Sequence, residues 1–136
     1  MVLMSQRIFC VDDSRDMREM IRDMVENLGH EFLGGVSSID ELCSWLQVHK
    51  AKDITIAIIN LSLESGLIDG RPDESGKDAE RILREAGFRG GVVWTTSWPT
   101  KALSEEVWIT EFPIIQKPFC LEGFNAALFI AALTAA

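Results

Sequence analysis

The stretch that decides the fold is ITIAIIN, residues 54–60. Its apolar side chains are mostly β-branched, which favours a strand, and the run is continuous, which is typical of a strand buried on both faces. The strand stops at a polar residue, Asn60. In an α/β protein the carboxyl end of a central strand is a common place for chemistry, so the neighbours of this amide bear on function.

Apolar runs of strand length lie on both sides of this stretch. They are RIFCVDD (7–13), the weaker HEFLGGV (30–36), GGVVWTTS (90–97) and FPIIQKPF (112–119). Helical patterns separate them. Five strands alternating with helices predict a doubly wound parallel sheet covered on both faces, in a single domain of residues 1–136.

Capping residues mark the helices between these strands. Ser14 is a predicted N-cap and Gly29 a predicted C-cap of the first helix, and Ser38 with Glu41 forms a capping-box pattern at the second. Further helices are predicted to begin near Lys77, near residue 101 (a short helix, 101–107) and at Leu121. The predicted apolar faces of the first three long helices are Met17, Met20, Ile21, Met24 and Leu28; Ile39, Leu42, Cys43 and Leu46; and Ala79, Ile82, Leu83 and Ala86.

Composition limits the class of protein. The chain has 136 residues, of which 47% are hydrophobic and 25% charged, as in a globular domain. A net charge of −8 and a pI of about 4.7 argue against binding to nucleic acid. The apolar run ALFIAALTAA (127–136) is too short to span a bilayer, and residues 1–11 make a poor signal peptide, so we expect a cytoplasmic protein without membrane contact.

The three cysteines are scattered along the chain, at Cys10, Cys43 and Cys120. They form neither a CxxC motif nor a metal-ligand spacing, which fits a reducing compartment. Because all three lie in or beside apolar stretches, we expect them to be small core residues.

Polar residues follow four of the five strands at one edge of the predicted sheet. Asp12 and Asp13 follow the first strand, Asn60 ends the third, residues 95–97 end the fourth and Lys117 ends the fifth. Each has an ordinary explanation when taken alone, such as a helix cap, a strand end or a surface lysine. Because parallel strands place their carboxyl ends at the same edge, the four together predict one site.

Three of these segments resemble the receiver domains of bacterial response regulators, the CheY-like family. RIFCVDDSRDMR (7–18) is similar to the acidic opening of that family, VVWTTS (92–97) to its fourth strand, and IIQKPF (114–119) to its Lys-Pro-Phe signature. The resemblance covers essentially the whole chain. It implies a flavodoxin-like α/β/α fold with strand order 2-1-3-4-5 and five helices, and a role in two-component phosphorelay signalling.

The resemblance also implies a metal site and a phosphoryl pocket. The metal ligands would be Asp12, Asp13, the side chain at position 60 and the backbone carbonyl of Ser62, all oxygen donors of the kind that Mg²⁺ prefers.

In the phosphoryl pocket, the resemblance implies that Thr96 would hydrogen-bond a phosphoryl oxygen and Lys117 would pair with its charge. The Lys117–Pro118 bond is often cis in the family.

Position 60 departs from the family, which has its phospho-accepting aspartate there. A carboxylate oxygen can attack phosphorus, whereas the neutral amide of Asn60 offers no anionic oxygen. The amide also removes a charge from the metal site, so we expect Mg²⁺ binding to be weakened. Lys117 loses its usual carboxylate partner and could pair with Asp13 instead.

Two further departures concern switching and access. The inward-rotating aromatic partner of Thr96 in the family is replaced here by Ile114, and the chain contains no tyrosine. The polar connection SLESGLIDGRPDESG (62–76) is longer than usual, and its Gly and Pro content argues against regular structure. That loop could lie across the pocket. Trp98 could also cover the pocket, or pack on a helix as a surface residue.

These observations favour a non-phosphorylatable receiver domain that is not an enzyme and acts by protein–protein interaction. Its partner would be a sensor histidine kinase or another signalling protein. By family analogy the contact surface is the fourth helix, fifth strand and fifth helix. The last helix (121–135) is apolar on more than one face, which a homodimer or a docked partner would bury; its apolar residues are Leu121, Phe124, Leu128, Phe129, Ile130 and Leu133.

Two alternatives stay open at the level of sequence. Asn60 could be an engineered replacement of the aspartate in an ordinary phospho-accepting receiver, which the natural gene sequence would settle. A flavodoxin-like ligand-binding or enzymatic domain is the other alternative. However, no Gly-rich phosphate loop and no Ser-His-Asp set is evident, and we interpret His30 and His49 as surface residues.

Overall fold

The computed structural model describes residues 3–63, 67–68, 71–72, 75–97 and 111–135. Five of its strands form one sheet in the order β2-β1-β3-β6-β7, and every neighbouring pair is parallel. The predicted order 2-1-3-4-5 is therefore confirmed. The strands are β1 (Arg7–Val11), β2 (Glu31–Val36), β3 (Ile56–Asn60), β6 (Gly91–Thr96) and β7 (Ile114–Gln116).

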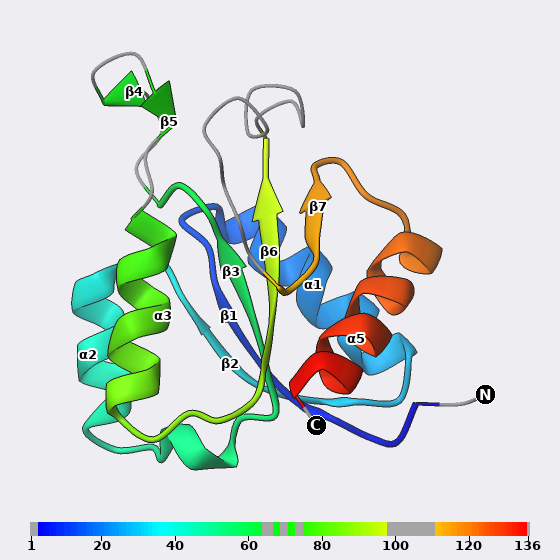
Figure 1. The fold of residues 1–136 in the computed structure, drawn as a ribbon, viewed down its shortest axis with the longest axis horizontal. Coiled ribbons are helices and arrows are strands. Elements are labelled where there is room, and N and C mark those ends of the chain that lie inside the picture. Colours follow the sequence, from blue (N-terminus) through cyan, green and yellow to red (C-terminus); the bar gives the residue numbers. More distant parts are fainter. Residues whose placement is uncertain (1–2, 64–66, 69–70, 73–74, 98–110, 136) are drawn as a thin grey trace.

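Helices cover both faces of this sheet, as the alternating pattern predicts. Figure 1 shows α2 and α3 on one face and α1 and α5 on the other. A single 3-10 turn, η1, leads into β3. The helices are α1 (Arg15–Asn27), α2 (Ile39–Leu46), η1 (Ala51–Asp53), α3 (Ser75–Glu85) and α5 (Leu121–Ala135).

The central strand β3 is buried along its whole length. Ala57 and Ile59 belong to the core beneath α2 and α3, while Ile56 and Ile58 belong to the core beneath α1 and α5. Successive side chains of a strand point to opposite faces, so a strand between two helical layers must be apolar throughout. This explains why ITIAIIN shows no alternation with polar residues.

The predicted caps are present. Ser14 Oγ accepts a hydrogen bond from the Met17 N–H at 3.2 Å, and Gly29 takes a positive φ of 83° just beyond α1. Ser38 Oγ accepts from the Glu41 N–H at 3.1 Å, but the Glu41 carboxylate bonds to Ser37 instead of closing a reciprocal box. The Ser37 hydroxyl, and then the Ser37 N–H, donate to the Glu41 carboxylate, and these two hydrogen bonds lower the pKa of that carboxyl.

Several predicted environments are wrong. Cys10 is buried, but Cys43 and Cys120 are exposed, because Leu42 and Trp45 provide the inward face of α2 and Cys120 precedes α5. Ala86 lies beyond the end of α3 and is exposed.

The long polar connection after β3 contains regular structure, contrary to our prediction. A two-stranded antiparallel ladder pairs β4 (Leu67–Ile68) with β5 (Arg71–Pro72). Figure 1 shows this ladder beyond the amino end of α3. The expected helix at 101–107 and Trp98 lie outside the described residues.

The last helix, α5, is only partly covered, as its sequence predicts. Phe124 and Leu128 are buried, whereas Ile130 and Leu133 are 49% and 59% exposed. The helix lies so close to β6 that a Cβ on Gly91 would come within 2.3 Å of the Ala131 carbonyl oxygen. No helix in the described part of the chain combines the length and apolarity needed to cross a membrane.

His30 is buried immediately before β2, not on the surface as predicted. Its Nδ1 accepts a hydrogen bond at 3.0 Å from the Gln6 N–H, which requires that this nitrogen carry no proton. Burial also lowers the pKa of the imidazole below its usual 6.5. The folded state therefore holds His30 as the neutral base.

We expect this burial to make stability pH-dependent. The unfolded chain takes up a proton on His30 at a higher pH than the folded chain, so the contribution of His30 is complete above the usual histidine pKa and is lost as pH falls below it. Between about pH 7.5 and about pH 5.5, the free energy of unfolding measured in urea should fall less for His30→Gln than for the unmodified protein. His49→Gln is the matched control at an exposed histidine. An unchanged pH dependence in His30→Gln would contradict this assignment.

Candidate functional site

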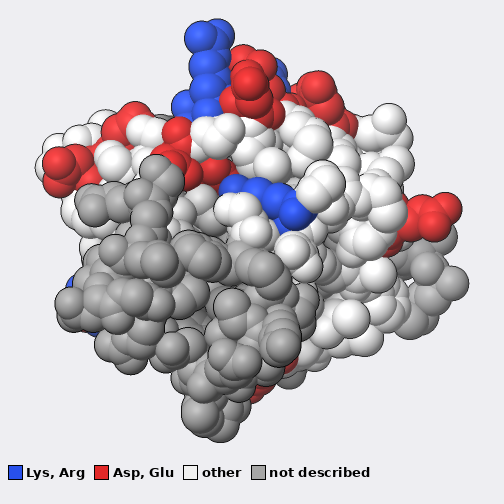
Figure 2. Space-filling view, turned by 90° about the horizontal axis from the view of Figure 1, so that it is seen from above, with Lys and Arg blue, Asp and Glu red and all other residues white. Residues whose placement is uncertain are grey.

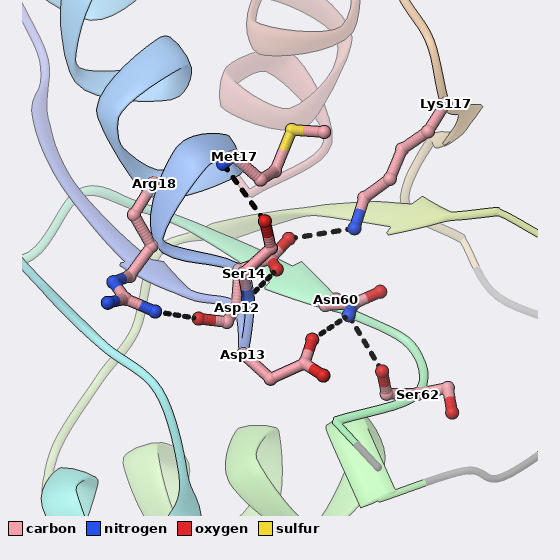
Figure 3. Close-up of polar contacts among 8 residues, drawn as sticks. All are labelled: Asp12, Asp13, Ser14, Met17, Arg18, Asn60, Ser62 and Lys117. Carbon is pink, nitrogen blue, oxygen red and sulfur yellow. Dashed lines mark hydrogen bonds and ion pairs between the residues drawn. The ribbon is translucent and has the colours of Figure 1, made fainter. Parts of the chain in front are cut away.

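The polar residues predicted to share one edge of the sheet do so. β1 ends immediately before Asp12, β3 ends at Asn60, and β7 ends one residue before Lys117. Their side chains converge at the carboxyl ends of the strands (Figure 3). Asn60 pairs in register with Thr95 of β6, which pairs with Ile115 of β7, so this row crosses the middle of the sheet.

Asp12 is fully buried and is surrounded by donors. Lys117 Nζ lies 2.9 Å from Asp12 Oδ2, forming an ion pair, and the Ser14 N–H donates to Oδ1 at 2.9 Å. The main-chain carbonyl of Asp12 accepts from Arg18 Nη1 at 2.7 Å. Sequence reasoning expected Lys117 to turn to Asp13, which is wrong: Asp12 is the buried carboxylate, and a buried charge has the greater need of a partner.

Asn60 is 5% exposed, and its amide nitrogen makes two hydrogen bonds. Nδ2 donates to Asp13 Oδ1 at 3.1 Å and to the Ser62 carbonyl oxygen at 2.7 Å. Figure 3 shows these two bonds leaving the same nitrogen towards two different loops. Because a carboxylate and a carbonyl are acceptors only, the nitrogen and not the oxygen of the amide must face them.

Lys117 reaches the site from the end of the edge strand β7. Its backbone N–H donates to the Thr96 carbonyl oxygen at 2.7 Å, and its side chain is 14% exposed. The Lys117–Pro118 peptide bond is cis, as the resemblance implies. The lysine therefore approaches Asp12 across the end of β6, with most of its side chain buried.

The hydroxyl residues at the end of β6 are both buried, with Thr95 at 0% and Thr96 at 1% exposure. Thr95 Oγ1 makes no hydrogen bond in the structure and lies on the strand position that pairs with Asn60. Ile114, the replacement for the expected switch aromatic, is partly buried and packs against the core beneath α2 and α3.

Gly76 sets the distance between α3 and the site. Its N–H donates to the Leu61 carbonyl oxygen at 2.9 Å, and a Cβ at this position would lie 2.2 Å from the Asn60 carbonyl oxygen. Only a glycine permits this approach. The sequence marks Gly76 as the glycine that closes the long connection, but it shows no sign of this contact.

Arg18 is a site neighbour that sequence reasoning missed. Its guanidinium holds the Asp12 carbonyl and so ties α1 to the end of β1. The only available signal was a basic residue six positions after the first aspartate.

Burial, and then the neighbouring Asp12 carboxylate, raise the pKa of the Cys10 thiol well above its usual range, so this cysteine is no nucleophile. Figure 2 looks onto this end of the molecule and shows acidic and basic side chains side by side on the described surface.

The oxygen atoms implied as magnesium ligands do not fit a cation as they are arranged. Asp13 Oδ1 and the Ser62 carbonyl both accept from the Asn60 amide, and Asp12 accepts from Lys117 and from the main chain. An NH₂ group therefore stands between the Asp13 and Ser62 oxygens. Within the described ranges, no three carboxylate, imidazole or thiol groups gather as a metal site.

Comparison with known proteins gives similarity of fold. No protein-family model and no curated protein sequence matches the chain. The receiver domain of the PhyR response regulator from Erythrobacter litoralis is 18% identical over 95% of this chain and 91% of that chain, with a TM-score of 0.71. A response regulator receiver protein from Sinorhizobium medicae WSM419 is 16% identical over 98% of both chains, with a TM-score of 0.71.

A longer structure is also similar. The response regulator PhyR from Brucella abortus is 25% identical, with a TM-score of 0.70; the match covers 95% of this chain and 48% of that one. The chain thus spans about half the length of that protein. These structural neighbours are response regulator receiver domains, so the chain has the receiver fold that its sequence predicts.

Proposed function

We propose that this chain is a receiver-like signalling domain that does not accept a phosphoryl group at position 60 and acts by binding other proteins. The observation that carries the proposal is Asn60 itself. It stands at the carboxyl end of the central strand, beside Asp13 and within reach of the Asp12–Lys117 pair, where the family has its phospho-acceptor. An amide there supplies no nucleophilic oxygen.

The rest of the proposal follows from this role. The domain, residues 1–136, carries out no catalysis of its own and works in the cytoplasm, apart from membranes and nucleic acid. Its partner is a sensor histidine kinase or another signalling protein. The partly exposed apolar side chains of α5, Ile130 and Leu133, support a contact through that helix, with a second copy or with the partner.

Any Mg²⁺ binding is weaker than in a receiver with three carboxylates, since only Asp12 and Asp13 carry charge. Both hydrogens of the Asn60 amide have acceptors in the pocket. This supports a natural asparagine at position 60 over an engineered replacement of aspartate in an otherwise ordinary receiver.

Phosphorylation measured by intact mass tests the proposal. The protein and its Asn60→Asp variant are incubated with acetyl phosphate or phosphoramidate and magnesium. We expect no adduct on the unmodified chain and a gain of about 80 Da, one phosphoryl group, on the variant, because only the variant has a carboxylate at position 60.

Asn125→Asp is the matched control, since it makes the same exchange at an exposed position of α5. It should give no adduct. A phosphoryl adduct on the unmodified chain would contradict the proposal. The absence of one on Asn60→Asp would mean that the pocket has lost more than its nucleophile.

A further inference from the structure

The Asn60 amide nitrogen lies between two groups that the family resemblance implies as ligands of a divalent cation. We propose that this amide takes the place of the cation: it joins the loop after β1 to the loop after β3 and blocks metal from the oxygens that it bonds. This inference deepens the proposed function and rests on it, because it takes Asn60 as the working residue of the site.

The geometry uses the whole donor capacity of the amide. An NH₂ group has two hydrogens, and Nδ2 has two acceptors, Asp13 Oδ1 at 3.1 Å and the Ser62 carbonyl at 2.7 Å. The two acceptors belong to different loops, so a single planar group links them. Figure 3 shows the nitrogen at the apex of this link, with the amide oxygen turned away.

The neighbouring carboxylate is satisfied independently. Asp12 accepts from Lys117 Nζ at 2.9 Å and from the Ser14 N–H at 2.9 Å, so both of its oxygens are bonded. A cation entering the site would have to displace the amide and weaken a buried ion pair. The hydrogen bond to Asp13 is also stronger than one from an amide to a neutral acceptor, because the Asp13 carboxylate is charged.

One consequence separates this mechanism from the simple loss of a charge. If Asn60 only lacks the charge of an aspartate, removing its side chain should not improve metal binding. If its N–H groups block the site, removing them should free Asp13 and the Ser62 carbonyl and improve binding, even though no charge is added.

Manganese binding followed by paramagnetic broadening of ¹⁵N–¹H spectra tests this directly. The probe is Mn²⁺ alone, with the unmodified protein, Asn60→Ala and Asn60→Asp. We expect Asn60→Ala to bind Mn²⁺ roughly tenfold more tightly than the unmodified protein, which corresponds to about 1.4 kcal/mol, and Asn60→Asp to bind more tightly still. Asn125→Asp, which adds a charge at an exposed position of α5, should bind as the unmodified protein does.

The outcomes are decisive in both directions. Equal binding by Asn60→Ala and the unmodified protein would overturn the proposal, and so would binding by the unmodified protein as tight as that of Asn60→Asp. A failure of Asn60→Asp to bind would also overturn it, because the amide would not be the obstacle. Manganese binding by the unmodified chain as tight as that of Asn60→Asp, without a phosphoryl adduct on the unmodified chain, would reject this inference and leave the proposed function standing.

A second measurement needs no variant at the site. The side-chain amide hydrogens of Asn60 should exchange with solvent more slowly than those of the exposed Asn125. The reason is that the Asn60 side chain is buried and each of its two amide hydrogens has an acceptor. Exchange as fast as that of Asn125 would overturn the proposal, even if Asn60→Ala failed to fold.

Discussion

Replacing Lys117 with methionine should lower the free energy of unfolding by about 3 kcal/mol, because it leaves a buried charge without a partner. Asp12 is fully buried, and its Oδ2 lies 2.9 Å from Lys117 Nζ. Methionine fills a similar volume but carries no charge. Urea unfolding followed by circular dichroism at neutral pH would measure the loss.

Two further variants separate the ion pair from packing. Lys52→Met makes the same exchange at an exposed lysine and should change stability little. Adding Asp12→Asn to Lys117→Met should recover much of the lost stability, because the double variant no longer buries an unpaired charge. A loss as large in the double variant as in Lys117→Met would show that the lysine stabilises the fold by packing alone.

Gly76→Ala should destabilise the protein by about 2 kcal/mol or more, since its methyl group has no space. The added Cβ would lie 2.2 Å from the Asn60 carbonyl oxygen and 2.9 Å from the Leu61 carbonyl oxygen, and neither backbone group can turn away without moving β3 or α3. Thermal unfolding would measure the loss. The shift of the strand end should also disturb the amide resonances of Asn60.

Gly123→Ala is the control with the opposite expected sign. A Cβ at this position of α5 would meet only Cys120 Sγ, at the ordinary contact distance of 3.7 Å. Alanine favours a helix over glycine by about 0.8–1 kcal/mol, so this variant should be more stable than the unmodified protein. Equal effects of the two glycine exchanges would contradict the steric argument at Gly76.

The two destabilising variants act on the same small region through different physics. Lys117 balances charge across the end of β6, while Gly76 lets the first turn of α3 approach the end of β3. In the same region, the Asn60 amide links the loop after β1 to the loop after β3. Its surroundings are therefore held by an ion pair, a close backbone contact and an amide bridge.

Much of the fold follows from local patterns in the sequence. Ser14, Gly29 and Ser38 take the predicted capping roles, because a cap depends on residues only a few positions away. ITIAIIN is a central strand because a strand between two helical layers needs apolar residues on both faces. The order of strands and helices, and hence the edge that carries the site, follows from these elements.

Several environments could not be predicted in this way. His30 is buried and accepts a hydrogen bond from a backbone N–H 24 positions away. Cys43 is exposed because Trp45 takes the inward position of a short helix. The β4–β5 ladder forms in a segment whose Gly and Pro content indicates a loop. Each outcome depends on packing against residues that the local pattern does not identify.

The same distinction between local pattern and tertiary packing applies to the site. The sequence by itself determined that an amide occupies the end of the central strand, and that two aspartates and a lysine end neighbouring strands. Only the tertiary structure decided that Lys117 pairs with Asp12 across 105 positions, and that the nitrogen of Asn60 bridges Asp13 and the Ser62 carbonyl. The reason is physical: residue type fixes which groups can donate or accept, whereas burial and three-dimensional neighbours choose among the acceptors.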